Sequence, residues 1–130
     1  MDGVPFRLDS GSGVPFYRQV IDQVLLAVAD GRLRPGERLP TVRQLAVDLS
    51  VNLNTIARAY REMEIRGIVE TQQGTGTFVA HRKAEKKTAE RRKALERLVD
   101  QALSGAAAQG FATEEFAEAL FERAEEAGRR

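Results

Sequence analysis

Residues 41–66 read TVRQLAVDLSVNLNTIARAYREMEIR, and the periodicity of this stretch predicts two short helices. Each helix has one apolar face, with side chains at three- and four-residue steps: Val42, Leu45, Ala46 and Leu49, then Ile56, Ala59, Tyr60 and Met63. Thr41 and Gln44 match a capping box that begins the first helix. Asn52 is expected to cap the second helix, and Gly67 follows its end.

The spacing between the two predicted helices is that of a helix-turn-helix. Ala46 provides a small side chain where the helices must cross closely, and Ser50 stands at the sharp turn, where glycine is usual. An ordinary helical hairpin would show the same periodicity and stays open as the alternative. The small residue, the turn and the second apolar stripe all fall in register, which favours a motif that docks on DNA.

The outer face of the second helix follows from its inner face. At about 100° per residue, with Ile56, Tyr60 and Met63 inward, the side chains that project outward are Asn54, Arg58, Arg61 and Ile65. Asn pairs bidentately with adenine and Arg with guanine, so Asn54 and Arg58 are candidate base contacts near the end that enters the groove. A solvated helix face is the alternative. For Arg61 a backbone contact or a surface salt bridge is the expectation.

The segments on either side complete a winged helix. Residues 15–30 have a helical apolar stripe that Gly31 ends, and Pro35-Gly36 marks a turn. Residues 68–71 and 77–79 predict a hairpin. Its loop carries Gln73, Gly74 and Thr75, which are expected to lie against a sugar-phosphate backbone. A tight turn without function is the alternative for Gly-Thr-Gly taken alone. Thr41 and Thr55 are further candidate phosphate ligands, and Arg43 is a candidate ligand of a phosphate or of a base edge.

Residues 81–130 predict a tail of two helices. The composition shifts to Ala, Glu, Lys and Arg from about residue 82, Gln109-Gly110 ends this long helix, and Thr113 is expected to cap the last one. The first tail helix opens with the basic run at 82–93. This run either extends the electrostatic reach toward DNA or, as the sequence favours, forms a solvated face that pairs with Glu85, Glu90 and the acidic last helix.

The tail exposes more apolar side chains than two helices can bury. The predicted dimerisation residues are Leu95, Leu98, Val99, Ala102, Leu103, Phe116, Leu120 and Phe121. A second copy of the tail would cover them in a C2 homodimer, as a four-helix arrangement or with swapped last helices. Two recognition helices would then address half-sites about 34 Å apart, or a multiple of that. A monomer whose tail folds back on its own winged helix is the alternative.

Composition excludes several classes of site. The 130 residues include no Cys and one His, His81, so disulfide scaffolds, cysteine zinc sites and two-His relays are ruled out. We expect no enzyme activity, cofactor or metal. No apolar run approaches ~20 residues and the start lacks a signal peptide, so a cytoplasmic protein without a membrane partner is expected. The net charge of +1 is balanced over 1–80, positive over 82–97 and negative over 98–130, so any DNA-binding charge must be local.

At this level of detail the sequence resembles a known family. PFYRQVI at 15–21, GRLRPGERLPTVRQLA at 31–46, VNLNTIARAY at 51–60, GIV at 67–69 and GTGTFV at 74–79 are similar to the GntR-type winged-helix repressors. The short two-helix tail resembles the YtrA-like branch, which lacks a large effector domain. The resemblance implies a homodimeric repressor of a nearby operon, often one that encodes an ABC transporter.

The resemblance also implies which residues contact the operator: Arg43, Asn52, Asn54, Thr55, Arg58 and the wing from Gln73 to Thr75. Two departures limit it. Leu53 stands where a polar residue or Pro is common, and Ala57 stands where other branches carry Arg. Base readout that those positions carry elsewhere is not carried over.

The expected fold is mainly α with a small β-hairpin. Residues 1–13 are predicted as a loose lead-in, 14–80 as a winged helix-turn-helix DNA-binding domain, and 81–130 as a dimerisation tail. The predicted function is a sequence-specific DNA-binding transcriptional regulator, a repressor on a pseudo-palindromic double-stranded operator. A winged-helix protein-interaction module and a non-specific architectural DNA-binding protein are the alternatives. No polar pocket is predicted in the tail, and the sequence leaves any small-molecule effector unknown.

Overall fold

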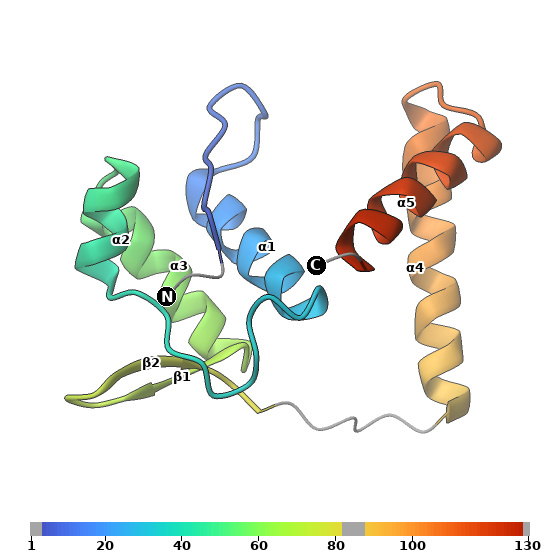
Figure 1. Ribbon diagram of the computed structural model, residues 1–130. Coiled ribbons are helices and arrows are strands. Elements are labelled where there is room, and N and C mark those ends of the chain that lie inside the picture. Colours follow the sequence, from blue (N-terminus) through green and yellow to red (C-terminus); the bar gives the residue numbers. More distant parts are fainter. Residues whose placement is uncertain (1–3, 82–87, 129–130) are drawn as a thin grey trace. The chain divides into compact units, whose positions relative to one another are not determined.

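The computed structural model describes residues 4–81 and 88–128, and its contacts divide the chain into two compact units, Met1–Arg82 and Lys83–Arg130 (Figure 1). The N-terminal unit contains three helices followed by two strands: α1 (Phe16–Ala29), α2 (Val42–Leu49), α3 (Leu53–Ile65), β1 (Val69–Gln72) and β2 (Gly76–Val79). The C-terminal unit contains α4 (Thr88–Ala108) and α5 (Thr113–Gly128). This order confirms the predicted mainly helical fold with a small hairpin.

The core of the N-terminal unit lies where α3 packs against α1, α2 and β1. The predicted apolar stripes supply it: Val20, Ile21 and Val24 from α1, Leu45 and Ala46 from α2, and Ile56, Ala59, Tyr60 and Met63 from α3 are all buried. Leu33 and Leu39 from the connecting segment close it further. Apolar packing therefore holds α1, α2 and β1 against α3.

Capping sets the start of α2 and α3. The Thr41 hydroxyl accepts the Gln44 N–H at 3.0 Å, and the Asn52 side chain accepts the Asn54 N–H at 2.7 Å. A full capping box would also have the Thr41 N–H donate to the Gln44 side-chain oxygen. That half of the prediction is wrong, since the described residues show no such bond, and the Gln44 amide nitrogen donates to Asp48 at 3.1 Å. Ser50 ends α2 in the left-handed region with φ 55°, which makes the turn that glycine usually makes.

The wing is an antiparallel pair, β1 and β2, with Val69 opposite Val79 and Gln72 opposite Gly76. The Thr75 N–H donates to the Gln72 carbonyl at 2.9 Å and closes the loop. Residues 37–39 run along the other edge of β2: the Leu39 N–H donates to the Thr77 carbonyl and the Val79 N–H to the Glu37 carbonyl, both at 2.8 Å. The segment before α2 is thereby fixed to the wing.

The lead-in packs on the N-terminal unit, so the expectation of a loose segment is wrong for residues 4–13. Gln19 is a buried polar side chain that receives the Asp9 N–H at 2.8 Å and donates to the Asp9 and Val14 carbonyls. Gln23 pairs in the same two-sided way with the backbone of Arg7. Phe6 and other apolar side chains of the segment then cover the core.

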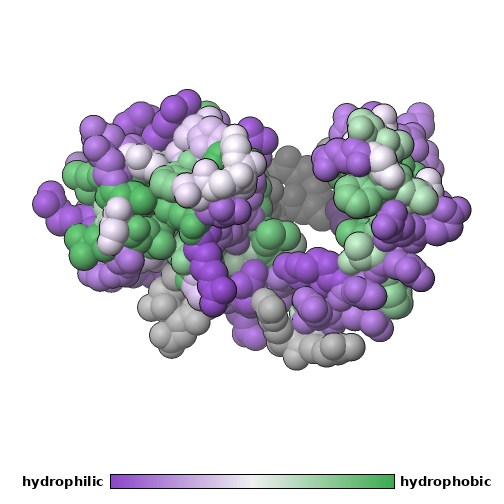
Figure 2. Space-filling model, turned by 90° about the horizontal axis from the view of Figure 1, so that it is seen from above, coloured by the Kyte–Doolittle hydropathy of each residue, from purple (hydrophilic) through white to green (hydrophobic). Residues whose placement is uncertain are grey.

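The C-terminal unit is a helical hairpin with almost no interior. Gly110, at φ 89°, follows α4, and the Phe111 N–H closes that end on the Ala106 carbonyl at 3.0 Å. Ala106 is the single buried residue among 88–127. Thr113 is the first residue of α5, so Ala112 occupies the cap position and the prediction of a Thr113 cap is wrong. Figure 2 shows green apolar surface among the charged side chains of this unit.

The structure describes only part of the basic run that opens the tail. Most of the basic run, at 82–87, lies outside the described residues. Within α4, Arg92 pairs with Glu96 at 3.3 Å, and both side chains are exposed.

In the described part of the chain, no helix combines the length and the apolar character needed to cross a bilayer.

Candidate nucleic-acid interface

The outer face of α3 carries polar side chains over a buried inner face. Asn52, Asn54, Arg58 and Arg61 are exposed and Thr55 is half-buried, while the inward residues are fully packed. Arg61 has no ion-pair partner among the described residues, so the salt bridge considered for it is not formed there. A helix with this division presents amide and guanidinium donors outward on a rigid support, which is the chemistry that reads base edges.

Arg58 is held by a neighbour that the sequence did not reveal as part of the site. Its guanidinium carbon lies 3.9 Å from the centroid of the Tyr17 ring on α1. Stacking occupies the face of the guanidinium, whereas its N–H groups point outward in the plane, so hydrogen bonding to a guanine edge or a phosphate remains open. Tyr17 falls within the apolar stripe predicted for residues 15–30, and no local pattern distinguishes that role from this one.

Tyr60 ties the recognition helix to the segment before α2. Its hydroxyl donates to the Pro40 carbonyl at 2.6 Å. Burial raises the pKa of Tyr60 above its usual value, because desolvation disfavours the phenolate. The hydroxyl therefore stays protonated and acts as a donor throughout the physiological range. This bond fixes Pro40 and, one residue later, the start of α2.

The start of α2 and the wing enclose a common hollow of about 420 Å³. Thr41 and Val42 line one side, and the loop from Gln72 to Gly76, with the flanking Thr71 and Thr77, lines the other. The structure therefore brings the predicted residues Thr41, Gln73, Gly74 and Thr75 to one place. Arg43, on the first turn of α2, is exposed.

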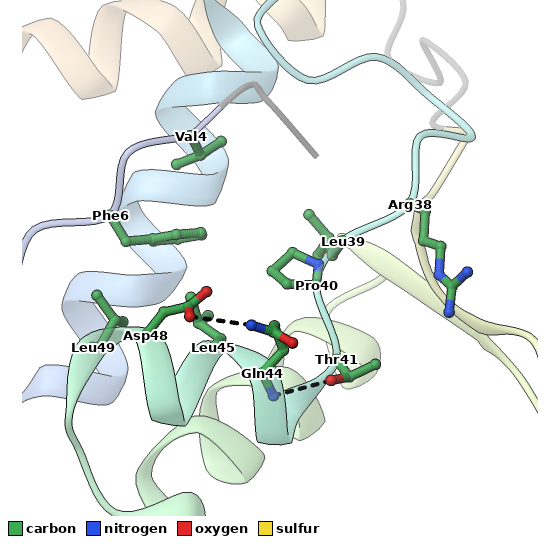
Figure 3. A pocket seen from close by; sticks show the side chains of 10 residues that line it. All are labelled: Val4, Phe6, Arg38, Leu39, Pro40, Thr41, Gln44, Leu45, Asp48 and Leu49. Atoms are coloured by element: carbon green, nitrogen blue, oxygen red, sulfur yellow. Dashed lines mark hydrogen bonds between the residues drawn. The ribbon is translucent and has the colours of Figure 1, made fainter.

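A second hollow, of about 560 Å³, lies between the lead-in and α2 (Figure 3). Val4, Phe6, Leu39 and Leu49 give it apolar walls, and Gln44 and Asp48 contribute a hydrogen-bonded polar pair. Arg38 borders both hollows. It is exposed and was not among the predicted site residues, although its position before Leu39-Pro40-Thr41 places it close to α2 along the chain.

Known sequences match the part of the chain that contains the outer face of α3. The family model described as bacterial regulatory proteins, gntR family, matches residues 16–79. The regulator Rv1152 of Mycobacterium tuberculosis is 51% identical over 74 residues, which is 57% of this chain and 61% of the relative. The transcriptional repressor YtrA of Bacillus subtilis is 40% identical over 74 residues, or 57% of each chain. The match thus spans about three fifths of the length of these curated relatives.

Several solved structures are also similar to this chain. A transcriptional antiterminator from Listeria monocytogenes has a TM-score of 0.77 at 24% identity, covers 97% of this chain and 94% of its own, and shows the shared fold. The GntR-family transcription factor YtrA from Sulfolobus acidocaldarius has a TM-score of 0.60 at 30% identity, over 76% of this chain and 97% of its own. AraR(DBD), solved in complex with operator ORX1, has a TM-score of 0.52 at 30% identity, over 56% and 93%.

Proposed function

The chain belongs to the GntR family of bacterial regulatory proteins, and from this premise we propose that it is a sequence-specific DNA-binding repressor that acts as a homodimer on a pseudo-palindromic operator. The family is one of transcription regulators and not of enzymes. The observation that carries the proposal is the exposed polar face of α3 above a fully buried inner face.

The exposed residues divide by the chemistry they retain. The Asn54 side chain offers an amide donor and an acceptor, and Arg58 offers guanidinium donors, which suit base edges in the major groove. The Asn52 oxygen already accepts the Asn54 N–H, whereas both of its amide N–H donors are free to bind a phosphate. Thr41, Arg43, Thr55 and Arg61 are the other phosphate ligands, and Gln73, Gly74 and Thr75 bring the wing against the backbone.

The homodimer is proposed from the surface of the C-terminal unit. Leu98, Leu120 and Phe121 expose 62%, 59% and 65% of their surface, and Leu95 and Val99 about half. Phe116 and Leu103 are only partly covered. A stable soluble hairpin does not leave a stripe of this size to water, and two copies would cover both faces at once. The dimer presents two α3 helices to two half-sites.

Repression follows from occlusion, because a bound dimer covers promoter DNA that polymerase needs. The curated relative YtrA is described as a transcriptional repressor, which supports this assignment. AraR(DBD) was solved with an operator, which supports duplex DNA as the partner. The resemblance extends the proposal to an operon beside the chain's own gene, with a transporter operon as the first candidate.

The function is tested by selecting duplexes from a random pool with the full chain. We expect enrichment of inverted repeats whose half-sites lie one helical turn apart or a multiple of it. Asn54→Ala should relax the preference at one position in each half-site, while Arg34→Ala, in the turn after α1, should leave the motif intact. Tight binding without enrichment would indicate an architectural protein, and absence of binding a protein-interaction module; either result would overturn the proposal.

A further inference from the structure

We propose that Arg38 is a further DNA-contacting residue, whose guanidinium binds one backbone phosphate between the wing and the start of α2. The inference rests on the proposed function and adds a residue that neither the sequence pattern nor the exposed face of α3 includes. Four features support it: the anchored backbone of Arg38, the contact of its side chain with Gly76, the neutral donors around its charge, and the path of the duplex.

The backbone of Arg38 is fixed to the wing. Arg38 forms a β-bridge with Phe78, and the hydrogen bonds of Glu37 and Leu39 to β2, both 2.8 Å long, lie on either side of it. Leu39 is 2% exposed, so the next residue anchors the segment in the core. The backbone of Arg38 is therefore held against β2 and is not part of a free loop.

The side chain of Arg38 lies across Gly76, at the start of β2. A Cβ on Gly76 would stand 2.9 Å from Nε of Arg38 and 3.4 Å from its Cζ and one terminal nitrogen. A side chain at position 76 would therefore displace the guanidinium from this position. Gly76 also has φ 140°, a conformation that favours glycine. The wing is thus shaped to let this guanidinium lie close against it.

The guanidinium has no fixed countercharge. Arg38 is exposed, and it forms no ion pair with the acids in the described part of the chain. The hollow that it lines, between α2 and the wing, offers neutral neighbours, among them Thr41, Gln73 and Thr75. The Thr41 hydroxyl accepts the Gln44 N–H and keeps its own hydrogen to donate. One cation among neutral donors is the composition of a phosphate site.

The path of the duplex brings a phosphate to this place. With α3 in the major groove and the wing on the adjacent minor groove, the strand that separates the two grooves has to pass between α3 and the wing. The hollow bordered by Arg38, Thr41 and the wing loop lies between the start of α2 and the wing, and we place a phosphate of that strand there. A phosphate contact there fixes the register of the protein on DNA and carries no sequence information.

The test compares Arg38→Gln with Arg34→Gln in the full chain. Both variants lose one positive charge, but Arg34 lies in the turn after α1 and outside both hollows. Binding to a selected duplex and to a random duplex is measured by fluorescence anisotropy from low to moderate salt. Each phosphate contact contributes a slope of about −0.9 to log K against log [salt], so Arg38→Gln should flatten the slope by roughly 0.9 per bound chain, or roughly 1.8 per dimer.

Two further measurements are expected to agree with a phosphate contact by Arg38. Affinity for the selected and the random duplex should fall by a similar factor, and Arg38→Lys should keep most of the slope because it keeps the charge. An unchanged slope in Arg38→Gln, or an equal flattening in Arg34→Gln, would overturn this inference and leave the proposed function standing. A wild-type chain that binds neither duplex would overturn both.

Discussion

At the scale of single residues, Arg58 is the clearest case of a proposed DNA contact whose side chain is ordered before DNA binds. A free arginine on a helix surface samples many rotamers, and ordering it on binding costs free energy. The Tyr17 ring, 3.9 Å from the guanidinium carbon, restricts that freedom while leaving the N–H groups available. We infer that Tyr17 positions Arg58 and does not itself read sequence.

The positioning role of Tyr17 is measured with a double-mutant cycle. Arg58→Ala should weaken binding to a selected duplex much more than to a random one, by about 1–3 kcal/mol of discrimination. Tyr17→Leu should cost about 0.5–1 kcal/mol of specific binding, whereas Tyr17→Phe keeps the ring and should cost little. In the Arg58→Ala background, Tyr17→Leu should have no further effect. If Arg58→Ala weakens both duplexes equally, Arg58 contacts phosphate and not a base.

Tyr60 has a structural role at the same scale, because its buried hydroxyl satisfies the Pro40 carbonyl. Tyr60→Phe removes the donor and leaves that carbonyl unpaired, so the free energy of unfolding should fall by about 1–2 kcal/mol. Denaturant unfolding of the full chain, followed by circular dichroism, measures the change. Tyr17→Phe is the matched control, since it removes a hydroxyl from a half-buried ring. An equal loss in both variants would contradict the importance of the Pro40 bond.

At the scale of elements, the turn between α2 and α3 stores strain. Ser50 has φ 55°. In this conformation a residue with a side chain loses roughly 1–2 kcal/mol of folding free energy relative to glycine. Glycine offsets part of this gain because it loses more conformational entropy on folding. Ser50→Gly should therefore raise the free energy of unfolding by about 0.5–1 kcal/mol in the same assay. Gly67→Ala, at φ 73° after α3, is the converse control and should lower it. A destabilised Ser50→Gly variant would mean that the Ser50 side chain contributes more than its conformation costs.

What the sequence predicted at this scale depended on local signals. The stripes of α2 and α3, the Asn52 cap and the hairpin follow from residues within one or two turns of each other, and the structure has all of them. The lead-in did not follow, because Gln19 and Gln23 pair with backbone groups 10 to 16 residues away. No periodicity encodes a contact of that separation between a glutamine and an irregular segment.

The same dependence on local signals explains which residues of the candidate site were predictable. The outward face of α3 was predictable by rotating a helix, so Asn54, Arg58 and Arg61 were identified from the sequence. Tyr17 and Arg38 were not, since each acts through a partner in another element, Arg58 in one case and Gly76 in the other. Sequence position shows that an arginine is present; only the fold shows which surface it lies against.

For the whole molecule, the proposed homodimer would hold its two DNA-binding units together through the C-terminal hairpins. Within α4 the exposed apolar residues fall on one side, Leu95, Leu98, Val99 and Ala102, and the remaining faces are polar or small. Ala106 is the one buried side chain among residues 88–127, so α4 and α5 bury little against each other. Apolar burial between two copies would supply the stabilisation that one hairpin lacks.

Leu98→Glu tests this interface without threatening the fold of the chain, because Leu98 is 62% exposed. A charge in the centre of an apolar interface carries a desolvation cost of several kcal/mol per ion, so the dimer should dissociate to monomers at micromolar concentration in analytical ultracentrifugation. Ser104→Glu adds the same charge on the opposite side of α4, at about 100° per residue, and should remain dimeric. Operator binding by Leu98→Glu should weaken, while its affinity for a single half-site stays close to wild type. A wild-type chain that sediments as a monomer, or a Leu98→Glu variant that stays dimeric, would place the interface elsewhere or remove it.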